Sequence, residues 1–197
     1  MTERLSLTTS DGVTLEARID SPARPDRFTV FCHPHPLHGG SMNAPLMIAV
    51  AGELVERGHA VLRFNFRGTG ASSGEHDYGR AELHDITAAF ALGETRQLPM
   101  FLAGWSFGAA TALRWLAHTN SMVPYAGIAP PPDDLPGELP SGPKRVILGN
   151  RDQVIDAESL KTYTVDHAID LLITPGDHFF HGRGKRIGDL VAQGLEG

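Results

Sequence analysis

The sequence has one cysteine, no long apolar run and no cluster of positive charge. Because Cys32 stands alone, no disulfide can form within the chain, and its place in an apolar run indicates a buried, unreactive thiol. No apolar stretch reaches the roughly 20 residues that a membrane-spanning helix needs. The net charge of −6, without any Lys/Arg-rich run, argues against a nucleic-acid surface. We therefore expect a cytoplasmic protein with no nucleic-acid or membrane partner.

The N-terminal residues also lack the apolar block of a secretory signal, because residues 1–4 lead directly into an alternating pattern. With 197 residues, 41% of them hydrophobic and 20% charged, the chain has the length and composition of one globular domain with a hydrophobic core. We expect a single domain over residues 1–197. The sequence does not indicate an oligomeric state.

The hydrophobic pattern predicts an α/β protein. Apolar and polar residues alternate on either side of Asp11-Gly12, which predicts an N-terminal antiparallel hairpin with a tight two-residue turn. Continuous apolar runs predict buried parallel strands at residues 28–32, 60–64, 100–103, 123–129, 145–148 and 169–173. Helical spacing predicts helices at residues 45–57, 83–93, 109–118, 157–163 and 179–193. This alternation specifies a mostly parallel sheet with helices on both faces and the hairpin at one edge.

The pentapeptide G-W-S-F-G at residues 104–108 is the most informative motif. It follows a predicted strand and opens an alanine-rich helix, the context in which G-x-S-x-G lifts a serine hydroxyl above the sheet on a strained turn. Gly104 and Gly108 would leave room for so sharp a turn. Ser106 would then be a nucleophile, with the amide of Phe107 facing a developing oxyanion. The alternative is a glycine-rich turn with an incidental serine.

A serine nucleophile needs a base and a carboxylate, which in this context follow it in the order serine, acid, histidine. Asp152 comes just after the predicted strand 145–148, at the end of the sheet where ligands bind. The alternative acid, Asp156, is explained by a helix N-cap. His178 follows the last predicted strand and is the candidate base, whereas His181 is expected one turn into the closing helix. We interpret Asp177 as a turn residue.

The second oxyanion donor is expected in the loop after the first parallel strand, at residues 33–40. Pro36 has no amide hydrogen and cannot donate. The donor is therefore the amide of Leu37 or of His35, and Leu37 is preferred. The same loop carries His33, His35 and His38 at a spacing seen in binuclear zinc hydrolases, although Leu37 replaces the carboxylate usual there; we expect no metal and no cofactor.

Taken together, these motifs resemble those of the α/β-hydrolase superfamily, specifically its small bacterial members that lack a cap domain and share an H-P-H-P-x-x-G-G loop. The resemblance covers nearly the whole chain, through motifs at residues 33–40, 63–72, 104–108, 149–152 and 177–182. It implies an α/β-hydrolase fold without a lid, with Ser106 as nucleophile, Asp152 as acid and His178 as base. The group is similar to dienelactone hydrolases, which use a cysteine in place of Ser106, and to minimal carboxylesterases.

We therefore expect a serine hydrolase that acts on a small-molecule acyl substrate, an ester of a small or short-chain acyl group. A thioesterase or lactonase on the same triad is an alternative, as is a non-enzymatic binding protein with this fold. Residues 130–143 form a short, proline-rich connection that is too small for a helical lid, which favours an open site. Arg67 could touch a substrate carboxylate or tie down its own loop, and we favour the structural role.

Overall fold

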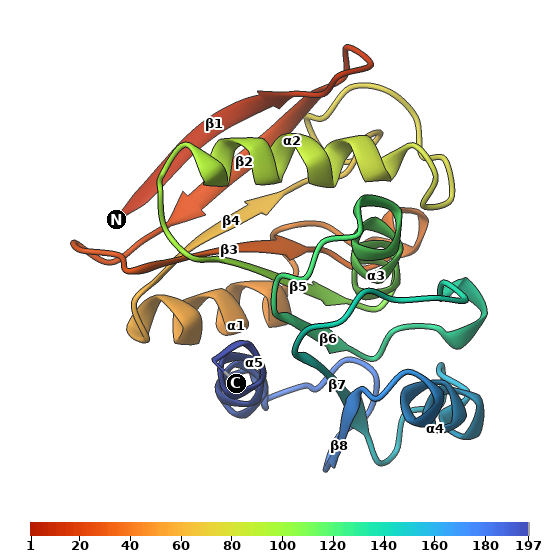
Figure 1. The fold of residues 1–197 in the computed structure, drawn as a ribbon. Helices are drawn as coiled ribbons and strands as arrows, with labels where there is room; N and C mark the ends of the chain where they lie inside the picture. Colours follow the sequence, from red (N-terminus) through yellow and green to blue (C-terminus); the bar gives the residue numbers. More distant parts are fainter. Residues whose placement is uncertain (197) are drawn as a thin grey trace.

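The computed structural model describes residues 1–196 and contains one eight-stranded sheet with helices on both faces (Figure 1). The strands lie in the order β1-β2-β4-β3-β5-β6-β7-β8. Their bounds are β1 (Thr2–Thr8), β2 (Thr14–Asp20), β3 (Arg27–Cys32), β4 (His59–Phe64), β5 (Met100–Trp105), β6 (Tyr125–Ile128), β7 (Lys144–Gly149) and β8 (Asp170–Thr174). The helices are α1 (Pro45–Glu56), α2 (Glu82–Glu94), α3 (Phe107–Thr119), α4 (Ala157–Asp166) and α5 (Gly184–Leu195), with short 3-10 turns at η1 (Pro36–His38) and η2 (Pro132–Asp134).

The fold class predicted from the hydrophobic pattern is confirmed. Strands β3 to β8 pair in parallel, and the β1–β2 hairpin joins the sheet antiparallel to β4. Helices α2 and α3 cover one face, and α1 and α5 pack together on the other (Figure 1). Each parallel crossover brings the carboxyl end of a strand to the same edge of the sheet, which is the edge where ligand sites form in such folds.

The hairpin turn is longer than the two residues predicted. The last paired residues are Thr8 and Thr14, so five residues connect the strands. Thr9 closes this loop because its amide donates to the Val13 carbonyl at 2.9 Å and its hydroxyl accepts from the Val13 amide, also at 2.9 Å. The Gly12 amide donates to the Thr9 carbonyl at 3.0 Å, so Asp11 lies within a tight turn, and its carboxylate pairs with Arg67 on the neighbouring loop.

The closing helix begins at Gly184 and not at residue 179, so the predicted start is wrong. Phe180 and Gly182 have φ angles of 50° and 69°, which a right-handed helix does not admit. The Asp177 carboxylate accepts hydrogen bonds from the amides at 179 and 180 and stabilises a turn there. His181 consequently lies in this turn and not in the helix.

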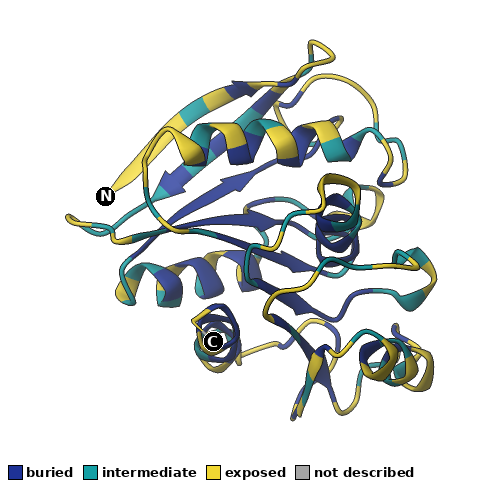
Figure 2. Cartoon of the chain, in the orientation of Figure 1, coloured by how far each residue is buried: buried dark blue, intermediate teal, exposed yellow. Residues whose placement is uncertain are grey.

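The centre of the sheet is the hydrophobic core, because helices cover it on both sides (Figure 2). All six residues of β4 and five of six in β3 and β5 are buried, as the continuous apolar runs predicted. Fully burying one Val, Leu, Ile or Phe side chain contributes about 1.5–3 kcal/mol, so these strands hold the frame on which the loops stand. Strand β1, at the open edge, is mostly exposed.

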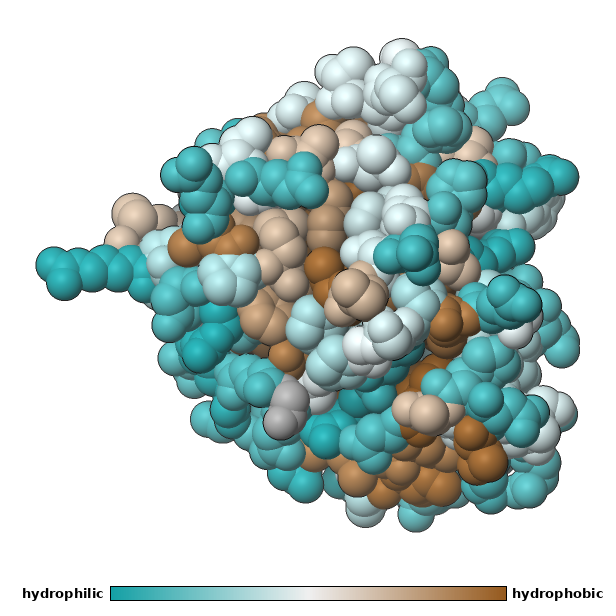
Figure 3. Space-filling view, viewed as in Figure 1, coloured by the Kyte–Doolittle hydropathy of each residue, from teal (hydrophilic) through white to brown (hydrophobic). Residues whose placement is uncertain are grey.

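The surface of the face seen in Figure 3 mixes hydrophilic and hydrophobic side chains, with hydrophobic ones dense in the lower half, where β8 and α4 lie. Val165 of α4 and Ile173 of β8 are among the exposed large hydrophobic residues. Of the helices within residues 1–196, none combines the length and apolar character needed to cross a bilayer.

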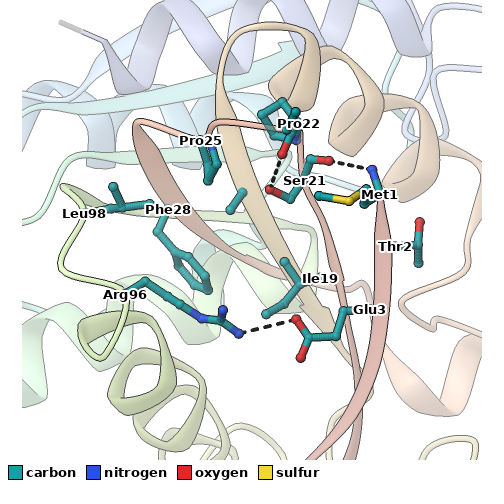
Figure 4. A pocket seen from close by; sticks show the side chains of 12 residues that line it. Met1, Thr2, Glu3, Ile19, Ser21, Pro22, Pro25, Phe28, Arg96 and Leu98 are labelled. Atoms are coloured by element: carbon teal, nitrogen blue, oxygen red, sulfur yellow. Dashed lines mark hydrogen bonds and ion pairs between the residues drawn. The ribbon is translucent and has the colours of Figure 1, made fainter.

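A hollow of about 650 Å³ lies where the parallel strands begin, opposite the edge that carries the predicted catalytic residues (Figure 4). Ile19, Phe28 and Leu98 contribute apolar side chains to its wall, and Arg96 pairs with Glu3 at 3.4 Å beside them. None of the predicted catalytic residues lines this hollow. The candidate site must therefore be sought at the other end of the sheet.

Candidate active site

Ser106 occupies the sharp turn between β5 and α3. Its φ of 53° and ψ of −120° lie in a region that non-glycine residues rarely adopt. A Cβ on Gly104 would lie 2.6 Å from the backbone nitrogen of Ala109, and one on Gly108 would lie 2.4 Å from the carbonyl oxygen of Cys32. Both positions therefore require glycine, and the turn holds the Ser106 side chain at the carboxyl end of β5.

The structure brings the three predicted catalytic side chains together. The Ser106 hydroxyl oxygen lies 3.1 Å from Nε2 of His178, and Nδ1 of the same ring lies 2.9 Å from Oδ2 of Asp152. The three residues follow three different strands, β5, β7 and β8, which end at the same edge of the sheet. The His178 and Asp152 side chains are only 7% and 1% exposed, so the contact between them is shielded from water.

Asp152 is held as a carboxylate. Burial raises the pKa of its carboxyl group, but hydrogen bonds from His178 and from the amides of Ile155 and Val154 outweigh burial and leave the pKa below its usual range. The two amides lie 3.0 and 2.8 Å from Oδ1. An ionised Asp152 accepts a hydrogen bond from Nδ1–H of His178. In that tautomer Nε2 carries no proton, and its lone pair faces Ser106.

Trp105 is a further residue of this site that the sequence analysis did not single out. Its indole nitrogen donates to the backbone carbonyl of His178 at 3.2 Å, and its side chain is 5% exposed. The variable position before the serine thus anchors the loop that carries the histidine. A buried indole needs a hydrogen-bond acceptor, but the sequence could not tell which one.

The alternative acids and bases have other partners. Asp156 caps α4 by accepting the amides of Glu158 and Ser159, which is the N-cap role expected for it. His181 is 79% exposed and lies 3.7 Å from Asp177, away from the serine contact. These side chains are therefore not part of the Ser106 arrangement.

The structure disfavours the preference for Leu37 as second oxyanion donor. Its amide donates to Nδ1 of the His35 ring at 3.2 Å and is not free to face an anion. Within residues 1–196, the amide of His35 itself has no hydrogen-bond acceptor, and neither does the amide of Phe107 at the start of α3. Of the three candidate amides, those of His35 and Phe107 are therefore the ones left without an acceptor. The sequence did not show that the His35 ring would accept the Leu37 amide.

A hollow of about 320 Å³ lies in front of Ser106 and His178. Trp105, Val154 and Phe179 give its wall an apolar character, and residues of the 33–40 loop form the other side. A second hollow of about 300 Å³ shares Trp105 and Phe179 with the first, so the two adjoin across these rings. Residues 130–143, the connection that contains η2, do not line either hollow. A substrate would therefore reach Ser106 from an open surface.

His33 is committed to the backbone, which bears on the zinc-loop alternative. Its Nδ1 lies 2.6 Å from the Pro34 carbonyl, and its Nε2 accepts the Phe66 amide at 3.0 Å. Burial lowers the pKa of the ring to about 4, so it is neutral at neutral pH. With both nitrogens engaged, His33 cannot serve as a metal ligand alongside His35 and His38. Within residues 1–196 no group of three potential ligands is arranged to hold a metal ion.

Arg67 lies away from the hollow and serves its own loop. Its buried guanidinium contacts Asp85 of α2 at 2.7 Å and Asp11 of the hairpin at 2.8 Å. The side chain thereby ties the 65–81 segment to two other parts of the fold. This agrees with the structural role favoured from the sequence, with carboxylates as its partners.

Comparison with known proteins gives a consistent result. The model of the alpha/beta hydrolase family matches residues 30–192. XC6422 from Xanthomonas campestris, described as an α/β serine hydrolase without lid, is 29% identical with a TM-score of 0.88, over 99% of this chain and 94% of its own. An α/β serine hydrolase homologue from Coxiella burnetii is 30% identical with a TM-score of 0.88, over 98% and 97%. Esterase Pf2001 from Pyrococcus furiosus, 20% identical, shares the fold with a TM-score of 0.81 over 98% and 92%.

The buried His33 ring predicts a loss of stability in mild acid. Between its ordinary pKa of 6.5 and its folded value of about 4, the unfolded chain binds a proton that the folded chain does not, so the free energy of unfolding falls as the pH falls. At roughly 1.4 kcal/mol per pH unit, this residue alone accounts for about 3 kcal/mol. Urea unfolding of the wild type and His33→Gln at pH 7.5 and pH 4 measures the difference. If the free energy of unfolding falls equally between pH 7.5 and pH 4 in the two proteins, the assignment to His33 is contradicted.

Proposed function

The chain belongs to the alpha/beta hydrolase family and is a hydrolase, and we propose that its reaction is the cleavage of carboxylic esters with small or short-chain acyl groups. The observation that carries this proposal is the unbroken contact from the Ser106 hydroxyl through the His178 ring to Asp152, at 3.1 and 2.9 Å. A serine hydroxyl is a weak nucleophile at neutral pH, and this contact supplies the base and the carboxylate that orients it. The description of Pf2001 as an esterase supports the ester as substrate class.

In the proposed mechanism, Nε2 of His178 takes the hydroxyl proton while Oγ of Ser106 attacks the ester carbonyl carbon. The carbonyl electron pair moves to its oxygen, and the resulting anion is held by the amides of Phe107 and His35. The pair returns, the bond to the leaving oxygen breaks, and the imidazolium gives its proton to the departing alcohol. Water then attacks the acyl-enzyme by the same steps and releases the acid.

Asp152 and the two amides act at different points of this cycle. The carboxylate stabilises the imidazolium that forms when the proton leaves serine, and its lowered pKa keeps it charged at neutral pH. The amides act only once charge develops on the substrate oxygen, so they lower the barrier without tightening the ground state. Removing one such donor typically costs roughly 10²–10³ in kcat.

The size of the site supports a small acyl group. The hollow at the serine is about 320 Å³, the lower end of the range for ligand sites, and the adjoining hollow is about 300 Å³. Val154 and Phe179 are 62% and 52% exposed, so the apolar wall is shallow and open to solvent. Such a wall can bury a short acyl chain but leaves a long one in water.

Ser106→Ala is expected to lower kcat by about 10⁴-fold or more, because it removes the attacking oxygen. The decisive measurement is hydrolysis of p-nitrophenyl acetate together with labelling by a fluorophosphonate probe. The wild type should be labelled at Ser106 and the variant should not. Undiminished hydrolysis by the variant, or labelling at another residue, would rule out Ser106 as nucleophile.

Asp152→Asn is expected to lower kcat by about 10⁴-fold with little change in KM, because an amide favours the wrong imidazole tautomer. Asp156→Asn is the matched control, since asparagine caps helices about as well as aspartate and the residue touches neither His178 nor Ser106. Steady-state kinetics of both variants shows which of the two aspartates is the catalytic acid. An inactive Asp156→Asn beside an active Asp152→Asn would reverse the assignment.

A series of p-nitrophenyl esters of increasing acyl length, run beside matched thioesters, tests the substrate class. We expect kcat/KM to peak at short chains, because the small hollow buries only a few methylenes, each worth about 0.8 kcal/mol when buried. A maximum at long chains would contradict the small-acyl assignment. A consistent preference for thioesters over esters of equal length would favour a thioesterase on the same triad.

A further inference from the structure

Three aromatic rings stand in a triangle beside the two amides proposed to hold the oxyanion. The ring centroids of His35 and Phe107 are 5.0 Å apart, those of His35 and His76 are 5.0 Å apart, and those of His76 and Phe107 are 5.1 Å apart. Two of these residues carry the candidate donors. The third, His76, belongs to the loop between β4 and α2 and has no part in the mechanism described above.

The triangle matters because few contacts set the distance between the two candidate donors. His35 follows β3 and Phe107 follows β5, and the ladder between these strands ends at Cys32 and Gly104. Beyond that pair, no hydrogen bond among residues 1–196 joins the 33–40 loop to residues 105–109. The close approach of Gly108 to the carbonyls of Cys32 and His33 fixes the bases of the two segments. Side-chain packing adds to this contact, because the ring of His76 lies against the side chains of both His35 and Phe107.

His76 is itself fixed from behind by a buried carboxylate. Its side chain is 6% exposed, and Nδ1 lies 2.8 Å from Oε1 of Glu82, which is fully buried. Neither ring nitrogen makes a hydrogen bond within residues 1–196, so the carboxylate meets the ring by close contact alone. The Glu82 carboxylate also accepts the amides of Asp77 and Gly79, both at 2.8 Å. One side chain of α2 thus holds both the ring and the loop that carries it.

We propose that His76 is a positioning residue for the oxyanion hole, an inference that rests on the proposed function. Held by Glu82, its ring wedges against His35 and Phe107 and keeps their amides at the spacing that one oxyanion requires. Such donors work at 2.7–3.1 Å from the oxyanion, so a shift of a fraction of an ångström weakens them. The role is exerted through two neighbours, and His76 does not touch the reacting atoms.

The test compares oxygen esters with thionoesters of the same acyl and leaving groups. A thionoester develops negative charge on sulfur, which is larger and a weaker hydrogen-bond acceptor than oxygen. The two amides therefore stabilise the transition state of a thionoester less than that of an oxygen ester. In His76→Ala we expect kcat for the oxygen ester to fall about 10-fold to 100-fold with KM nearly unchanged, less than the loss of a whole donor. The kcat for the thionoester should fall much less, so the ratio of the two rates should decrease.

Two further variants separate ring geometry from simple filling of space. His76→Phe keeps a flat ring, and the buried Glu82 carboxylate keeps the amides of Asp77 and Gly79 as its partners. This variant should therefore recover kcat and the oxygen-to-sulfur ratio to within about threefold of the wild type. His76→Leu fills the volume without a ring and should behave like His76→Ala, and it replaces that variant if alanine does not fold. His118→Ala, at the exposed end of α3, is the control histidine and should leave both rates unchanged.

Ser106→Ala, measured in the same series, keeps the two proposals distinct. If it is inactive while His76→Ala and His76→Leu keep the wild-type kcat and ratio, the serine mechanism stands and the positioning role is overturned. A fall in both rates by the same factor would also overturn it, because a general structural defect does not discriminate oxygen from sulfur. If Ser106→Ala retains full activity, the proposed function itself fails.

Discussion

The strained backbone at Ser106 is the constraint on which the rest of the site depends. A residue in such a conformation costs about 1–3 kcal/mol and persists only where its surroundings hold it. Here the Ser106 amide donates to the Ile128 carbonyl of β6 at 2.7 Å, and its own carbonyl accepts the amides of Ala109 and Ala110 in α3. The sheet and the helix thus offset the strain. Together they hold the Ser106 hydroxyl oxygen 3.1 Å from Nε2 of His178.

Around that turn, the fold uses buried charge to organise loops that come from distant parts of the chain. Asp152 remains ionised despite its burial because two amides and the His178 ring stabilise its charge. Arg67 joins Asp85 and Asp11, and Glu82 holds the loop that carries His76. For the buried Arg67–Asp85 pair, removing either member would leave an uncompensated buried charge, so this contact constrains the loop that carries Arg67. Charged groups outside Ser106, His178 and Asp152 therefore fix the loops that surround the carboxyl edge of the sheet.

Most of the fold could be predicted because its signals are local. Apolar runs marked the strands, and the glycines at 104 and 108 marked the turn, since only glycine fits so close to Ala109 and the Cys32 carbonyl. The failures also have local causes that the sequence hides. The closing helix begins late because Phe180 and Gly182 adopt left-handed conformations, which depend on the turn that Asp177 stabilises.

The sequence by itself determined the fold class and identified Ser106, Asp152 and His178 as candidates. Strand ends, chain order and the need for glycine all follow from the order of the residues alone. Only the tertiary structure decided which amide after β3 is free. The ring of His35 accepts the Leu37 amide, and this choice depends on how a side chain rotates in a folded loop. The contacts of Trp105 with the loop that carries His178, and of His76 with His35 and Phe107, likewise exist only after packing. Side-chain contacts between segments that are far apart in the chain produce no periodic pattern in the sequence, so they could not be predicted from it.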